Sequence, residues 1–232
     1  MNRDSHNEWL FTAGVVMDKT SEKRRSRKTR QIADQRREIL EAAEKVFSEK
    51  GFVSAKVEEI AHEAAYAVGT LYKLFDSKEE LYAALLNQKS AIFQARVDGV
   101  LADGGSPREQ VERLFRVRVD VFWEERRFFR LFFHQTMNTV CDPRAGFTEE
   151  VRARYEAFLP VVEKLFADGI EQGVFRRVSP ALLTIAFESL LRGYLVQLSH
   201  SESPERHREE EDRMLELFLA GALAPPEPKE ST

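Results

Sequence analysis

Cysteine is almost absent from this 232-residue chain, which has a single thiol, Cys141. One cysteine excludes an internal disulfide and fits a reducing cytoplasm. No residue near Cys141 has the character of a base partner, so a nucleophilic role for this thiol is not expected. The sequence therefore points away from disulfide-stabilised domains and from cysteine enzymes.

Long apolar runs and strand-like alternation are also scarce. No continuous apolar run approaches the roughly 18 residues that a membrane span requires, so no such span is expected. No segment alternates apolar and polar residues for long, so a β-sheet is not expected either. Apolar residues instead recur at helical spacing, and the length allows one or two domains with a substantial core. The sequence predicts an all-α fold.

Positive charge is in short supply overall, because the net charge is −4, but it is unevenly distributed. Residues 23–78 carry 13 Lys and Arg against 9 Asp and Glu, a net of +4, whereas residues 79–232 have a net of −6. A basic segment in an acidic chain is typical of a region that neutralises DNA phosphates. The densest part, Lys23–Arg30, is either a solvated polar arm or an arm that touches phosphates or the minor groove.

Two short helices with a tight turn between them are predicted from Val57 to Lys78. Apolar residues recur at i, i+3, i+4 and i+7 on both sides of a break at Ala65–Ala67. These residues are Val57, Ile60, Ala61 and Ala64 in the first helix, and Val68, Leu71, Tyr72 and Phe75 in the second. The arrangement predicts a helix-turn-helix, whose second helix enters the DNA major groove. A helix before it is predicted to end at Gly51 in a left-handed cap.

The same region resembles the DNA-binding domain of the tetracycline-repressor (TetR) family of bacterial transcriptional regulators. The resemblance starts with RREILEAAEKVFSEKGF (36–52), continues through EEIA (58–61) and ends with GTLYKLFDSKEEL (69–81). It implies an N-terminal three-helix helix-turn-helix DNA-binding domain followed by a helical ligand-binding and dimerisation domain. A two-fold symmetric dimer of this kind implies a palindromic operator.

The resemblance also assigns candidate DNA contacts. Tyr72 and Lys78 would contact the backbone, since a phenol and a cation both suit phosphates. Val68, Thr70 and Lys73 would face the groove, where methyl groups suit thymine and lysine suits guanine. The candidates, with Lys56 as a further phosphate contact, are Lys56, Val68, Thr70, Tyr72, Lys73 and Lys78. Tyr72 could instead be a core aromatic, and Lys78 a solvated lysine at a helix start.

The chain departs from the family in the turn, where members usually have Gly followed by Val-Ser and this chain has Ala65, Tyr66 and Ala67. Alanine tolerates unusual backbone angles less well than glycine, so a slightly strained turn is predicted. Ala67 stands at the N-cap of the recognition helix and cannot replace the serine, a loss of about 0.5–2 kcal/mol. Lys56 likewise replaces a capping threonine and cannot cap. These departures keep a rival open: an enzyme or small-molecule binding protein with a vestigial DNA domain.

Capping boxes and prolines mark the starts of later helices. The predicted starts are Ser77–Glu80, Ser106–Glu109, Ser179–Pro180 and Ser203–Pro204. The first of these helices is expected to run to about Asp103, where Gly104–Gly105 breaks it. Pro160 is expected to kink a helix from about Thr148 to Gln172.

The aromatic-rich segment from Val111 to Met137 is either core or the wall of a ligand pocket. TetR-family C-terminal domains usually hold such a pocket, but they diverge widely, so the resemblance names no ligand. The pocket candidates are Phe122, Trp123, Phe129, Phe133, His134 and Met137. His134 has no second metal-binding residue at i+3 or i+4, so no metal site is predicted. No cofactor and no catalytic residues are predicted.

The last two helices are predicted to carry assembly. Leu182 to Leu198 is apolar nearly all round, which requires burial on more than one side. By resemblance, the helices at about 180–200 and 204–223 of two subunits form a four-helix bundle; the alternative is one monomeric core. Arginine at Leu191 is predicted to give a monomer or an unfolded chain.

These observations divide the chain into four segments: a disordered leader (1–22), the basic arm and DNA-binding domain (23–78), the ligand-binding and dimerisation domain (79–223) and a disordered tail (224–232). Met17, rather than Met1, is a candidate for the natural start. The sequence predicts a cytoplasmic homodimeric repressor that a small apolar or amphipathic molecule releases from its operator. A transcriptional activator or a ligand-free regulator is the alternative, and neither operator nor effector is identified.

Overall fold

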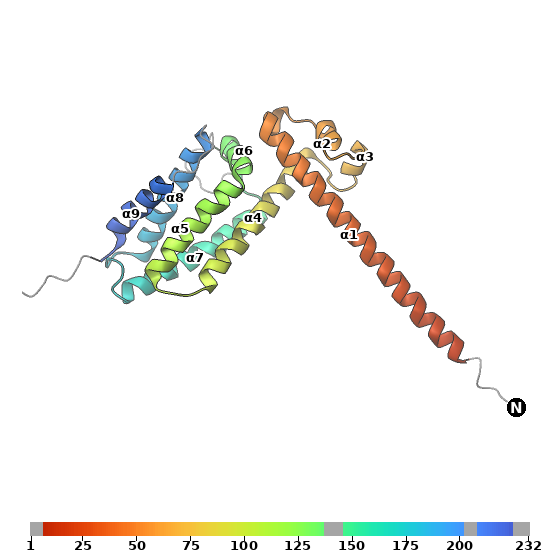
Figure 1. The fold of residues 1–232 in the computed structure, drawn as a ribbon, viewed down its shortest axis with the longest axis horizontal. Helices are drawn as coiled ribbons and strands as arrows, with labels where there is room; N and C mark the ends of the chain where they lie inside the picture. Colours follow the sequence, from red (N-terminus) through yellow and green to blue (C-terminus); the bar gives the residue numbers. More distant parts are fainter. Residues whose placement is uncertain (1–6, 137–145, 202–207, 225–232) are drawn as a thin grey trace, which may run out of the picture.

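The structure of the chain, a computed structural model, describes residues 7–136, 146–201 and 208–224, and it describes side chains from Ser21 onward (Figure 1). Within these ranges the fold is helical, and the one β feature is an isolated antiparallel bridge between Phe175 and Leu223. The helices are α1 (Asn7–Ser54), α2 (Val57–Glu63), α3 (Val68–Leu71), α4 (Lys78–Ala102), α5 (Pro107–Glu124), α6 (Arg126–Thr136), α7 (Glu149–Glu171), α8 (Pro180–His200) and α9 (Arg208–Ala222). The all-α prediction is confirmed.

The helices form two groups that α4 connects (Figure 1). Residues 36–77, which include the second half of α1 with α2 and α3, form a small group that we call the reading head. Helices α4 to α9 form a larger bundle that we call the body. Helix α1 also packs directly on α4 and α6 of the body, so the reading head contacts two helices of the body.

The core of the reading head follows the predicted apolar spacing. Five apolar residues of α1 are buried at helical spacing, and so are the main apolar residues of α2, of α3 and of the segment after α3: Ile39, Leu40, Ala43, Val46, Phe47, Ile60, Ala61, Leu71 and Phe75. Burying one large apolar side chain contributes about 1.5–3 kcal/mol. The ring of Phe47 packs on Phe52 and Tyr82, with centroids 5.6 and 5.8 Å away, and burial raises the pKa of Tyr82 to about 12.

Helix α1 extends much further toward the N-terminus than predicted. It begins at Asn7, so the predicted disordered leader is helical from Asn7 to Glu22, while residues 1–6 lie outside the described part of the chain. This stretch contains one glycine and no proline, so nothing in it stops a helix that residues 23–36 already propagate. The basic run Lys23–Arg30 is helical and exposed on this projecting part (Figure 1).

Gly51 interrupts α1 rather than ending it. Its φ of 77° is positive, as predicted, but its ψ of 158° is extended, so it is not a left-handed helical cap. The chain kinks at Gly51 and makes one more helical turn, to Ser54, before α2 begins. After the kink, the carbonyl oxygens of Phe52, Val53 and Ala55 accept hydrogen bonds from Lys78 at the start of α4.

Three predicted helix starts are confirmed by cap hydrogen bonds, and α8 begins at Pro180 as predicted but without a side-chain cap from Ser179. The hydroxyls of Ser77, Ser106 and Thr148 accept from backbone N–H groups of their own first turns at 3.0, 3.3 and 3.2 Å. Gly104 and Gly105 separate α4 from α5 with φ angles of 66° and 97°. Helix α7 runs through Pro160 as one element, and the kink predicted there stays a prediction. The predicted start at Ser203–Pro204 lies outside the described residues.

In the described part of the chain one helix, α8, is long and apolar enough to cross a membrane by length and composition. The sequence does not show α8 as an unbroken apolar run, because scattered Thr, Ser and Gly residues interrupt its leucines. Helix α8 packs on α5, α6, α7 and α9, and 39% of its most apolar window is buried. The core helix of a bundle has this composition too, so the observation is weak evidence for a membrane.

Candidate DNA interface and effector region

The recognition helix begins where the sequence predicts. Ala67 is extended, with φ −69° and ψ 144°, and the backbone N–H of Thr70 donates to its carbonyl oxygen at 2.8 Å. No side chain caps the helix, as expected for alanine at this position. Ala65 has a φ of 57° and is the one non-glycine residue with positive φ in the described part of the chain, so the predicted strain in the turn is present.

The candidate DNA contacts differ in exposure. The Tyr72 side chain is 50% exposed, so it is not a core aromatic, and the side chains of Lys56 and Lys73 are exposed as well. Val68 and Thr70 are partly buried, and Val68 packs against the apolar core. The reading head thus presents a phenol and two ammonium groups to solvent, while Val68 and Thr70 have less surface available for base edges.

Lys78 is engaged within the protein. Its ammonium donates to the carbonyl oxygens of Phe52, Val53 and Ala55 at 2.8, 3.2 and 3.0 Å, and it lies 4.7 Å from the centroid of the Phe52 ring. An ammonium has three N–H groups, and all three have carbonyl partners here. Lys78 is therefore not a freely solvated lysine, and a phosphate could bind it only by displacing a carbonyl.

Two further side chains, not predicted from the sequence, hold the turn and the residues that follow α3 to α1. Arg36 donates to the carbonyl oxygen of Leu74 at 2.6 Å, and its guanidinium lies 4.2 Å from the centroid of the Phe75 ring. The Tyr66 hydroxyl donates to Glu38 at 2.5 Å, and this hydrogen bond raises the pKa of Tyr66. In both contacts the two residues are far apart in the sequence, so no local sequence pattern predicts these contacts.

The start of α2 is stabilised from inside the helix instead of by its N-cap residue. Lys56 provides no side-chain cap, as predicted, but the Glu59 carboxylate accepts from the backbone N–H of Lys56 at 3.3 Å. Glu59 also accepts from Lys50 of α1 at 2.8 Å. The hydrogen bond from Lys50, and after it the one from Lys56, lowers the pKa of Glu59.

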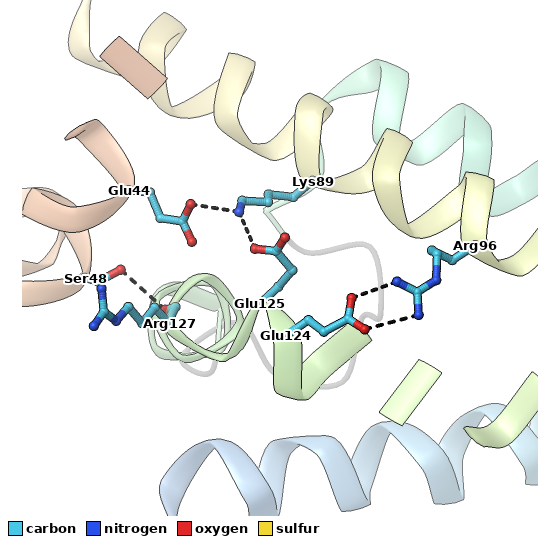
Figure 2. A network of polar contacts seen from close by, with 7 residues as sticks. All are labelled: Glu44, Ser48, Lys89, Arg96, Glu124, Glu125 and Arg127. Atoms are coloured by element: carbon cyan, nitrogen blue, oxygen red, sulfur yellow. Dashed lines mark hydrogen bonds and ion pairs between the residues drawn. The ribbon is translucent and has the colours of Figure 1, made fainter. Parts of the chain in front are cut away.

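A network of ion pairs joins the reading head to the body (Figure 2). The Lys89 ammonium of α4 lies 2.7 Å from a carboxylate oxygen of Glu44 in α1, and it also pairs with Glu125 at the α5–α6 junction. Burial lowers the pKa of Lys89, but its hydrogen bonds to Glu125 and Glu44 outweigh that effect and raise it overall. The position of the reading head is thereby tied to both α4 and α6.

The predicted pocket residues form a packed cluster. Phe122 and Phe133 are buried, and the ring of Phe129 lies between them with centroids 5.6 and 6.0 Å away. The His134 side chain is exposed, and Met137 lies outside the described residues. Two hollows of about 500 Å³ occur in the described part of the chain. Trp123 lines one of them, and none of the three phenylalanines lines either.

The body contains a buried ion pair that the sequence did not reveal. Arg118 of α5 is 8% exposed and donates to Glu188 of α8 through two nitrogens, one of them at 2.9 Å. Three phenylalanine rings, Phe93, Phe158 and Phe187, lie 5.6–6.0 Å from its guanidinium. Among the residues that the structure describes, no group of three His, Cys, Asp or Glu could hold a metal ion.

The amino-acid sequence is similar to those of known transcriptional regulators. The family model for bacterial regulatory proteins of the tetR family matches residues 39–85. The chain is 26% identical over 147 residues to the transcriptional repressor KstR2 of Mycobacterium tuberculosis, covering 63% of this chain and 72% of that protein. It is 28% identical over 159 residues to the transcriptional activator FasR of Mycolicibacterium smegmatis, covering 67% and 71%. The chain belongs to the TetR family of transcriptional regulators.

The similarity in fold extends beyond the DNA-binding region. A structure of the transcriptional regulator FadR from Bacillus subtilis in complex with stearoyl-CoA aligns with 79% of this chain and 97% of its own, with a TM-score of 0.66 and 17% identity. At that identity the match concerns the fold alone. This TetR-family protein binds DNA through its helix-turn-helix and is a transcriptional regulator rather than an enzyme.

Proposed function

We propose that this TetR-family protein is a homodimeric repressor that binds a palindromic operator and is released by a small apolar or amphipathic effector. The observation that carries the proposal is the reading head itself, in which α3 begins at Val68, ends at Leu71 and not near Phe75 as predicted, and is followed directly by an exposed phenol and an exposed ammonium, those of Tyr72 and Lys73. Phosphate contacts from Tyr72 and Lys56 would position α3, and Lys73, Thr70 and Val68 would face bases.

A stripe of exposed apolar and small residues on α8 and α9 supports the dimer. Leu182 and Ile185 are 57% and 61% exposed in α8, and Leu217 is 68% exposed in α9. Ala186, Ser189 and Gly193 continue the stripe along the same face of α8. A second copy packed on this stripe would form a four-helix bundle and bury the apolar face that makes α8 resemble a membrane span.

We propose that each of the two groups of helices has its own function. Residues 23–78 would bind DNA, and residues 79–223 would bind the effector and the second subunit. The basic helical segment Lys23–Arg30, exposed beyond the reading head, would add backbone contacts outside the major groove. A regulator of this kind acts where the genome is, so we infer a cytoplasmic location.

The effector region is proposed to be the body. FadR, a relative in fold, binds stearoyl-CoA, and KstR2 and FasR are a repressor and an activator. In the described part of the chain, the apolar interior of the body contains a buried ion pair, Arg118–Glu188, among phenylalanine rings. Breaking a buried pair is costly, so an amphipathic ligand that engages Arg118 would have to replace the contacts that Glu188 makes.

Selection of bound fragments from the host genome tests this proposal. We expect enrichment of an inverted repeat whose half-sites lie about 34–36 Å apart, or a multiple of that. Transcription of the neighbouring genes should rise when the protein is removed. No enriched sequence would refute specific DNA binding, and transcription that falls would make the protein an activator.

A further inference from the structure

One hollow, of about 500 Å³, lies where α1 of the reading head meets the junction of α5 and α6. Small-molecule sites typically have volumes of about 300–1,000 Å³, so the hollow is large enough for a ligand. Its charged lining consists of three arginines and three glutamates, beside Trp123: Arg126, Arg127, Arg130, Glu44, Glu124 and Glu125. The balance between these charges decides what the hollow can bind.

Cations outside the hollow pair with all three glutamates (Figure 2). Lys89 pairs with both Glu44 and Glu125. Arg96 binds Glu124 through two hydrogen bonds of 2.7 and 3.2 Å. These two cations leave one negative charge against the three arginines of the wall, a net of two positive charges.

The arginines have few partners of their own. Arg127 and Arg130 are exposed and make no ion pair with any residue that the structure describes. Arg126 donates to the carbonyl oxygen of Ser201 at 2.7 Å and lies 4.9 Å from the centroid of the Trp123 ring. Its Nε is buried without a partner among the described residues. Burial, and after it the charge of Arg130, lowers the pKa of Arg126. The effect of Arg130 shows that the arginines of the wall repel one another, and an anion between them would relieve that repulsion.

We propose that this hollow binds a phosphate-bearing small molecule, with adjacent phosphate groups held by Arg127 and Arg130 beside Arg126. The guanidinium fork matches phosphate oxygens and forms charge-assisted, bidentate hydrogen bonds. The two phosphate groups of a diphosphate diester, with one negative charge each, balance the net charge of the wall. Since Glu44 belongs to α1 and the arginines to α6, the ligand lies between the reading head and the body. This site rests on the proposed function only for its regulatory meaning, because binding itself needs no DNA.

Titration of inorganic pyrophosphate into the full-length protein, followed by calorimetry without DNA, tests the site. The double variant Arg127→Gln/Arg130→Gln removes the two exposed arginines of the wall. Its control, Arg108→Gln/Arg177→Gln, removes two exposed arginines elsewhere and gives the same net charge. We expect the wild type and the control to bind with equal affinity and the wall variant to bind at least about tenfold more weakly. No binding by the wild type, or equal weakening in both variants, overturns the proposal.

A second measurement separates small-molecule binding from DNA binding. If Arg127 and Arg130 contact the DNA backbone instead, the wall variant loses affinity for all duplexes. The slope of the logarithm of the binding constant against the logarithm of the salt concentration then becomes shallower by about two per subunit. We expect its salt dependence to equal that of the control, and a change of that size overturns the proposal. The two hypotheses can fail separately: pyrophosphate binding without DNA binding refutes only the proposed function, and the reverse result refutes only this site.

Discussion

The Lys78 ammonium at the start of α4 lies 2.8 Å from the carbonyl oxygen of Phe52, in the turn that follows the kink at Gly51. The carbonyl oxygens of Val53 and Ala55 accept from the same ammonium. These bonds join the end of α1 to the helix that leads into the body. In the free protein Lys78 is thus a structural clamp, whereas the sequence predicted a phosphate contact.

Replacing Lys78 with alanine should lower the free energy of unfolding by about 2–3 kcal/mol, because three carbonyls lose a charged donor. Chemical denaturation measures this change. Because Lys78 is held by these carbonyl oxygens, we also expect DNA binding by Lys78→Ala to depend on salt concentration as strongly as DNA binding by the wild type. Lys56→Ala, which removes an exposed ammonium, is the control. Its free energy of unfolding should stay within about 0.5 kcal/mol of the wild type. The slope of the logarithm of its DNA-binding constant against the logarithm of salt concentration should become shallower by about one per subunit. The same change of slope in Lys78→Ala would restore the phosphate contact predicted from the sequence.

Ala65→Gly should stabilise the protein. Ala65 has a φ of 57°, and this conformation costs a non-glycine residue about 1–2 kcal/mol. Glycine relieves that strain but loses about 0.5–1 kcal/mol of backbone entropy, so we expect the free energy of unfolding, measured by thermal denaturation, to rise by up to about 1.5 kcal/mol. Ala64→Gly is the control, because Ala64 has a right-handed φ of −75° and the same change there should destabilise. A loss of stability in Ala65→Gly would contradict the strained turn.

Ala67→Ser should tighten DNA binding and stabilise the recognition helix. The extended backbone of Ala67 is suited to an N-cap, and a serine hydroxyl there would accept from a backbone N–H and donate to a phosphate, a gain on the order of 1 kcal/mol for the cap. Because a phosphate carries no sequence information, binding to specific and scrambled duplexes should improve equally. Weaker binding, or a gain on one sequence alone, would show that the helix does not begin to read DNA at Val68.

The double variant Leu182→Arg/Ile185→Arg should remain folded but sediment as a monomer. Both residues are more than half exposed in the isolated chain, so charge there is harmless until a second subunit covers it. Val53→Arg, at a residue that is 82% exposed in the reading head, is the control and should remain a dimer. A double variant that still sediments as a dimer would place the interface elsewhere.

Leu191 cannot serve this purpose, although the sequence suggested it. Its side chain is fully buried within a single chain, so Leu191→Arg would report on the core of the body and not on assembly. Apolar composition shows that α8 is buried on more than one side, but not which residues face the same chain and which face a partner. The exposed fraction of Leu182 and Ile185 makes that distinction, and it requires the fold.

Local features were predictable because their causes are local. The start of α3 at Val68 and the break at Gly104–Gly105 follow from side chains within one turn. The pairs Lys78–Phe52, Arg36–Leu74 and Lys89–Glu44 depend on which helices meet, and sequence spacing contains no such information. The aromatic segment illustrates the same limit: spacing identifies Phe122 and Phe129 as apolar, but only the packed rings show that no open space lies between them.

The central claim is that two copies of α3 read DNA as one unit, and anisotropy titration of three labelled duplexes tests it most directly. The duplexes are the selected operator, the same operator with one half-site scrambled, and a fully scrambled sequence, each measured over a range of salt concentrations. We predict one dimer on the intact operator, binding at least about 10³-fold tighter than on scrambled DNA, with affinity falling as salt rises and most of the specificity lost with one half-site. Equal affinity for all three duplexes would contradict the account.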